Sequence, residues 1–84
     1  MQNVVISPEQ SRAARALLNK TADQIRVEAG LGVNTLPRFE RGLTSLNMST
    51  VQKLVGAYNR LGIIFPDPDT VRRVRVVQPV DKAA

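Results

Sequence analysis

The sequence predicts a mainly α-helical protein, a bundle of four to five helices followed by a short C-terminal β-hairpin. Three observations support this prediction. Helix-start signals precede several segments in which apolar residues recur at helical spacing, and glycine or asparagine follows those segments. From residue 63 onward the pattern changes to β-prone residues around a proline-rich turn. The chain has 84 residues, so we expect one domain, near the size at which oligomerisation often adds stability.

Two capping boxes mark the starts of the first two helices. Ser7 is followed three residues later by Gln10, with proline at the first helical position between them. Thr21 and Gln24 repeat this arrangement, and Gly30 stands in the usual place after a helix end. The first helix should stop near residues 19–20. The apolar residues at helical spacing in it are Ala13, Ala14, Leu17 and Leu18.

The third helix is expected over about Val33–Arg41, after a connection of only three residues, but Pro37 conflicts with a start that early. With Gly32 as the N-cap, Pro37 is the fifth helical residue and loses a hydrogen bond, at a cost of about 3 kcal/mol. With Asn34 as the cap, it is the third, where its missing N–H would have had no partner. We therefore expect a late start, with Asn34 near the cap, or a distorted first turn.

A long fourth helix should begin after Asn47 and run to about residue 61, ended by Gly62. Its apolar stripe consists of Val51, Leu54, Val55, Tyr58 and Leu61. Beyond it, Ile63–Phe65 and Val71–Val77 flank a turn at residues 66–69, which predicts a hairpin. The segment Val4–Ile6 is expected to add a strand to that hairpin, in the same subunit or a partner. The expected organisation is an arm or strand over 1–6, a helical domain over 7–62, a hairpin over 63–77 serving dimerisation, and a flexible tail over 78–84.

Composition narrows the classes of function. Twelve basic residues, nine of them arginine, oppose seven acidic ones, and the resulting charge of +5 favours a polyanionic partner; the alternative is a solvated basic surface. There is no cysteine or histidine, which excludes thiolate zinc sites and histidine-based catalysis. We therefore expect no cofactor, no metal and no enzymatic activity. No apolar run approaches a membrane span, so a cytoplasmic protein is expected.

Two capped helices joined by a short glycine-containing turn are typical of a helix-turn-helix. The residues themselves are more specific. The segment SRAARALLNKTADQIRVEAGLGVNTLPRFERG, with MSTVQKLVGAYNRLGI after it, resembles the Xre family of Cro- and lambda-repressor-like proteins. The resemblance covers about residues 7–65 and rests most on RAARALL, on Ala29–Gly30 and on NTLPRFERG. It implies a compact helical DNA-binding bundle, used in small repressors and regulators and commonly dimeric.

The same resemblance places Val33, Asn34 and Arg38 where the family reads base edges. The chemistry agrees for two of them, because asparagine can bond to adenine at two points and arginine to guanine. Val33 could touch only a thymine methyl group. The competing interpretations are that Asn34 caps the helix locally and that Arg38 is a solvated helix residue.

Further residues correspond to family positions outside base reading. Thr35 falls at a phosphate contact or a packing hydroxyl, and Arg41 and Lys53 flank the loop after the third helix as phosphate partners or solvated charges. Arg15 and Glu40 match the positions of an ion pair between the first and third helices. If mostly buried, that pair would orient the third helix more than it would add stability.

Four departures from the family pattern, one of them Pro37, favour an alternative function. Ala22 replaces a glutamine that usually contacts phosphate, and Arg26 replaces a small residue at a close helix approach, so the helices splay or the Arg26 stem bends toward solvent. Gly32 replaces a capping serine or threonine. The leading hypothesis is a dimeric regulator that binds an operator in double-stranded DNA. The alternative is a protein-interaction module, such as an anti-activator or antitoxin, that uses the hairpin edge.

Overall fold

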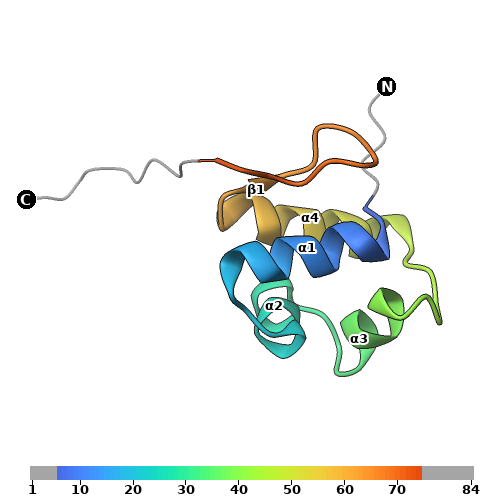
Figure 1. Ribbon diagram of the computed structural model, residues 1–84. Helices are drawn as coiled ribbons and strands as arrows, with labels where there is room; N and C mark the ends of the chain where they lie inside the picture. The colour runs from blue at the N-terminus through green and yellow to red at the C-terminus, as the bar shows by residue number, and fades with distance from the viewer. Residues whose placement is uncertain (1–5, 75–84) are drawn as a thin grey trace, which may run out of the picture.

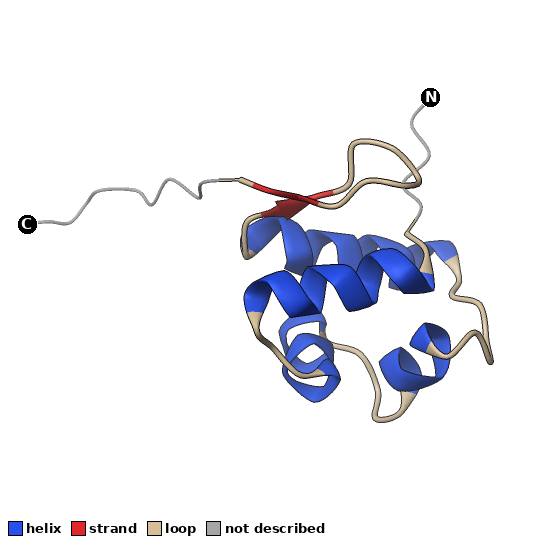
Figure 2. Ribbon diagram, viewed as in Figure 1, coloured by secondary structure: helices blue, strands red, loops and turns tan. Residues whose placement is uncertain are grey.

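A computed structural model describes residues 6–74 of the chain. This part folds into four helices and a two-stranded antiparallel hairpin (Figures 1 and 2), so the predicted fold class is confirmed. The elements are α1 (Pro8–Leu18), α2 (Ala22–Ala29), α3 (Thr35–Glu40), α4 (Met48–Arg60), β1 (Ile63–Ile64) and β2 (Arg72–Arg73). The strand expected at 4–6, the far end of the hairpin at 75–77 and the tail at 78–84 fall wholly or largely outside the described residues.

Side-chain caps start α1, α2 and α4, as the sequence predicts. In α1, the Ser7 hydroxyl accepts from the Gln10 N–H at 3.0 Å while the Gln10 side chain accepts from the Ser7 N–H at 2.9 Å. Thr21 and Gln24 form the same reciprocal pair at the start of α2, at 3.1 and 2.9 Å. The Asn47 side chain caps α4. Each cap satisfies amide groups that have no partner inside the helix.

Left-handed residues end the first two helices. Asn19 has φ 55° and follows α1, which confirms the predicted stop, and Gly30 has φ 72° and follows α2. In both cases the left-handed turn lets backbone N–H groups return to carbonyls of the last helical turn. Glycine adopts this conformation without the penalty that a side chain imposes. The chain therefore reverses sharply after α1 and α2.

The centre of the core comes from α4. Its Leu54 and Tyr58 are fully buried and pack with residues of the other elements, among them Ile25 of α2, Leu36 of α3 and Ile63 of β1. The rest of the predicted α4 stripe, Val51, Val55 and Leu61, lies partly buried against this core. All four helices and the hairpin therefore share one apolar interior.

One face of α1 differs from the expectation. Ala14 is fully buried and Leu18 partly so, but Ala13 is exposed and Leu17 is 43% exposed. Helical spacing identifies residues that share a face, but it cannot show how wide a face the neighbouring helices cover. Here Ser11 takes an interior position, fully buried, because polar partners from other elements meet it there.

The hairpin is shorter than predicted, with two residues in each strand. Ile63 pairs with Arg73 and Ile64 with Arg72. Phe65, expected in the first strand, lies outside it and packs edge-on against Tyr58, with ring centroids 5.6 Å apart. The proline that follows Phe65 cannot donate to a ladder, and it is a physical reason for the early end of the strand.

The loop between the strands is tied to α1. The side-chain amide of the buried Gln10 donates to the carbonyls of Asp67 and Thr70, at 2.9 Å each. The Asp67 carboxylate accepts from the Thr70 hydroxyl at 2.8 Å and from the Asp69 N–H at 2.9 Å, and these bonds lower the pKa of Asp67. The loop therefore has a defined conformation on the bundle.

Within residues 6–74, no helix is both long and apolar enough to cross a membrane. The longest, α4, has 13 residues, whereas a span needs about 20. The same part of the chain brings together no three His, Cys, Asp or Glu side chains that could hold a metal ion.

Candidate nucleic-acid interface

The start of α3 shows how the chain accommodates Pro37. The helix begins at Thr35, so the expected range Val33–Arg41 was too long at its start, and the predicted late start with Asn34 at the cap position is confirmed. Pro37 is then the third helical residue, where no intrahelical acceptor exists for the N–H that proline lacks. Val33 therefore lies in the turn before α3 and not on the helix.

Asn34 occupies the cap position without capping through its side chain. Its backbone is left-handed, with φ 74°, and its side chain makes no capping hydrogen bond. Asn34 therefore stands at the cap position, but the interpretation that its side chain caps the helix is wrong. A cap side chain normally reaches the next N–H groups from an extended backbone, which a left-handed residue does not have. The amide of Asn34 is left exposed to solvent.

The expected base-reading residues gather in one open hollow. Val33, Asn34, Thr35 and Arg38 line it from the start of α3, so the structure brings four of the predicted site residues together. The opposite wall is formed by the α3–α4 loop and the start of α4. The residues on that wall are Thr44, Ser45, Leu46, Asn47 and Thr50.

Thr44 and Ser45 are not among the site residues predicted from the sequence. Both are exposed residues of the loop, and their hydroxyl groups can donate to phosphate or base oxygens. The available signal was the hydroxyl-containing LTSL segment directly after the third helix. Its position across from Asn34 and Arg38 depends on how α3 packs, which local sequence patterns do not specify.

Three basic residues of the predicted site are exposed and have no side-chain partner in the described part of the chain. The side chains of Arg38, Arg41 and Lys53 make no hydrogen bond or ion pair there. Arg38 lines the hollow, whereas Arg41 and Lys53 are not among its lining residues. Their charges are therefore available to an anionic partner near α3.

Most other arginines of residues 6–74 bond to backbone carbonyls, mainly near helix ends. Arg60 donates to the Glu28 carbonyl at 2.9 Å near the end of α2, and Arg73 to the Leu17 carbonyl at 3.1 Å near the end of α1. Such bonds satisfy carbonyls left without partners at helix ends. The number of basic residues in the sequence is therefore larger than the number of basic side chains that are available to a partner.

Arg26, one of the departures from the family pattern, is accommodated by contacts of its side chain at the surface. Its guanidinium pairs with Asp23 at 2.7 Å and donates to the Leu31 carbonyl at 3.2 Å, and the side chain is 23% exposed. The stem therefore runs along the α2–α3 connection with its charge satisfied at the surface. Ala22, at another of these departures, is partly buried against the core and offers no polar side chain.

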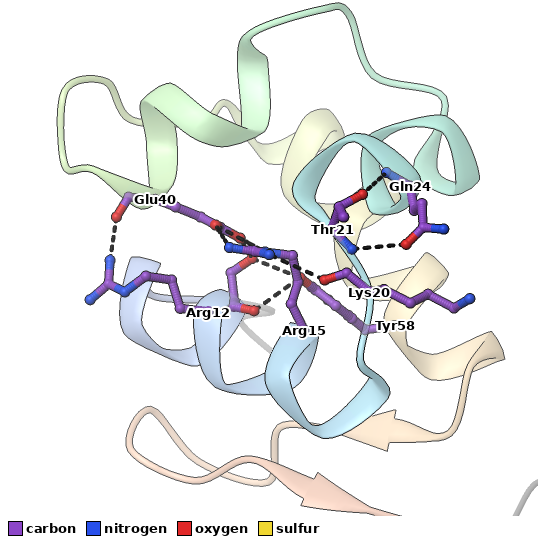
Figure 3. Close-up of polar contacts among 8 residues, drawn as sticks. Arg12, Arg15, Lys20, Thr21, Gln24, Glu40 and Tyr58 are labelled. Carbon is purple, nitrogen blue, oxygen red and sulfur yellow. Dashed lines mark hydrogen bonds and ion pairs between the residues drawn. The ribbon is translucent and has the colours of Figure 1, made fainter.

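A buried polar cluster holds the last residue of α3 (Figure 3). Arg15 donates to the Glu40 carboxylate through Nε at 3.0 and 3.1 Å and through Nη2 at 2.8 Å, which is the ion pair that the family resemblance implies. Arg12 donates to the Glu40 carbonyl. The hydrogen bond to Glu40 raises the pKa of Arg15. The end of α3 is thereby fastened to α1.

Comparison of the whole chain with protein-family models found no matching family, and comparison with curated proteins found no match.

Proposed function

We propose that the protein is a sequence-specific DNA-binding regulator of the Xre type. One observation carries the proposal: the exposed side chains of Asn34 and Arg38 line one open hollow at the start of α3 and have no side-chain partner within residues 6–74. These are the two side chains suited to reading adenine and guanine at two points each. Hydroxyl groups across the hollow and the net charge of +5 suit a phosphate backbone on either side.

Each site residue has a role in this proposal. Arg38 bonds to O6 and N7 of a guanine in the major groove, Asn34 bonds to an adenine, and Val33 touches a thymine methyl group. Because Val33 and Asn34 precede α3, the helix enters the groove with its N-terminal end foremost. The surrounding phosphate contacts come from Thr35, Arg41, Lys53, Thr44 and Ser45.

The proposal includes a homodimer that joins through the hairpin. The Gly62 carbonyl accepts from the Val74 N–H at 2.7 Å, and bonded and non-bonded pairs alternate along an antiparallel ladder. The backbone N–H and C=O of Arg73, one residue earlier, therefore point away from β1, toward an edge that no other strand of residues 6–74 covers. A dimer of this kind would present its two α3 helices to half-sites about 34 Å apart. Occupying an operator would make the protein nucleoid-associated.

Fluorescence anisotropy tests the DNA proposal. DNA selected from a random pool by the purified protein is titrated at several salt concentrations, and affinity should fall steeply as salt rises. Arg38→Ala should weaken binding to the selected sequence roughly 10- to 100-fold and relax its preference at one base pair. Arg60→Ala is the matched control, because it removes the same charge at the C-terminal end of α4, outside the hollow. Absent or salt-insensitive binding would overturn the proposal.

The exposed hairpin edge also supports a second function, a protein-interaction module. Figure 1 places the hairpin and α3 on opposite sides of the layer formed by α1 and α4, so the edge is open while α3 engages DNA. Edge strands with unpaired backbone groups can accept a strand from another chain. Under this alternative the edge binds another regulator and not a second copy.

Sedimentation equilibrium separates the two uses of the edge. A dimer of the 9.2 kDa chain should appear for the unaltered protein and for Arg73→Ala, but not for Arg73→Pro. Proline removes the outward N–H without removing a bond to β1. A mass of one chain at every concentration would instead favour the protein-interaction module.

A further inference from the structure

A chain of hydroxyl groups connects α4 to the ion pair at the end of α3. The Ser11 hydroxyl of α1 lies 2.5 Å from Oε2 of Glu40 and 2.8 Å from the Tyr58 hydroxyl of α4. The Tyr58 hydroxyl also donates to the Ser11 carbonyl at 3.1 Å. Ser11 and Tyr58 are both fully buried, and Glu40 is 5% exposed. These contacts join α1, α3 and α4 at one point of the interior.

The direction of the donors in this chain follows from chemistry. The Glu40 carboxylate is ion-paired with Arg15 and accepts hydrogen bonds from it, so the single proton of the Ser11 hydroxyl goes to Glu40. Ser11 Oγ then has only lone pairs to offer to Tyr58. The Tyr58 proton therefore points to Ser11, shared between Oγ and the carbonyl oxygen. Each hydroxyl group therefore donates toward Glu40, and the series of hydrogen bonds ends at the Glu40 carboxylate.

The two hydroxyl groups restrain Glu40 differently from Arg15. The Arg15 side chain is long and 24% exposed, so it can follow a displaced carboxylate. Ser11 and Tyr58 have short or rigid side chains enclosed by the core, and buried side chains in close-packed interiors do not shift freely. Ser11 holds the Glu40 carboxylate directly, and Tyr58 acts on it through Ser11. Because Glu40 is the last residue of the six-residue α3, fixing it limits rotation of the whole short helix.

We propose that Tyr58 and Ser11 are positioning residues for the base-reading groups. They act through Glu40 and set the orientation in which α3 presents Arg38. This inference rests on the proposed DNA-binding function for its consequence, but the positioning itself is a property of the protein alone. Neither residue lines the hollow, so neither touches DNA in this proposal.

Amide hydrogen exchange of the full chain, measured residue by residue by NMR, tests the positioning without DNA. Tyr58→Phe keeps the ring and removes the hydroxyl, and Ser11→Ala removes the link to Glu40. In both variants the amides of α3 should exchange about tenfold faster relative to those of α4, in proportion to one lost buried hydrogen bond. Equal changes in α3 and α4 would show a merely structural role and overturn the proposal.

A matched control perturbs the same ring without touching the hydroxyl chain. Phe65 packs edge-on against Tyr58, so Phe65→Leu should loosen that packing and lower stability. It should leave the ratio of α3 to α4 exchange rates unchanged. A selective loosening of α3 in Phe65→Leu would mean that core packing, and not the hydroxyl chain, positions α3.

The second readout is DNA specificity. At a temperature where all variants are folded, Tyr58→Phe should lower the ratio of affinities for selected and random DNA about fivefold, with random-sequence affinity unchanged. If Tyr58 had only a structural role, this ratio would stay unaltered. An unaltered ratio would therefore overturn the proposal that Tyr58 affects base reading. If the unaltered protein binds no DNA, the proposed function fails by itself, while the exchange rates still decide whether Tyr58 and Ser11 position α3.

Discussion

Replacing Arg15 alone should destabilise the protein more than replacing Arg15 and Glu40 together. The Glu40 carboxylate is 5% exposed and receives three of its hydrogen bonds from Arg15, at 2.8 to 3.1 Å. Arg15→Met leaves that charge inside the protein without its cation. The double variant Arg15→Met, Glu40→Leu removes both charges and fills similar volume with apolar groups, which proteins often tolerate well.

The expected magnitudes follow from burial. Breaking a buried pair by removing one partner costs about 3–5 kcal/mol, and the 24% exposure of Arg15 places this case near 3 kcal/mol. In the double variant, Ser11 loses the acceptor of its 2.5 Å bond, at a cost of about 1 kcal/mol. For a domain of this size, the melting temperature should fall by roughly 12–24 °C in the single variant and roughly 4–8 °C in the double variant.

Urea unfolding followed by far-ultraviolet circular dichroism measures these differences. Arg41→Met is the matched control, because Arg41 is exposed and makes no side-chain bond within residues 6–74; it should change stability by less than about 0.5 kcal/mol. If Arg15→Met proves no more costly than the double variant, the reasoning about an uncompensated buried charge is refuted.

Three further predictions concern single residues. Tyr58 is the only tyrosine of the chain, and burial raises its pKa to about 12; the Ser11 hydrogen bond and Arg15 oppose this shift, and Glu40 adds to it. Unfolded tyrosine titrates near 10, so stability present below pH 10 should be lost toward pH 12 by up to about 1.4 kcal/mol per pH unit; a tyrosinate absorbance midpoint near pH 10 in the folded protein would contradict this. Asn34→Gly should keep or slightly raise the melting temperature, since φ is 74°, while DNA affinity falls about tenfold; a large loss of stability would count against it. Thr21→Ala removes one half of the α2 capping box and should cost about 1 kcal/mol in urea unfolding, and an unchanged midpoint would contradict the cap.

Local patterns in the sequence predicted the helical framework well. The capping boxes at Ser7 and Thr21, the cap at Asn47 and the late start forced by Pro37 all appear in the structure. The physical reason is that caps, turns and proline act on backbone groups within about four residues, so neighbouring letters carry the information. The ion pair of Arg15 with Glu40 was also anticipated, but from a family resemblance and not from local physics.

Tertiary structure alone decided which polar groups are used inside the protein and which are left at the surface. Ser11 and Tyr58, 47 positions apart, share a buried bond because α1 packs beside α4. The same packing uses Arg60 and Arg73 on backbone carbonyls, while Arg38 is left without a side-chain partner in residues 6–74. By itself the sequence determined the helices, their ends and the amount of charge. The partner that each charged or hydroxyl side chain binds depended on contacts between distant segments, which exist only after the core has formed.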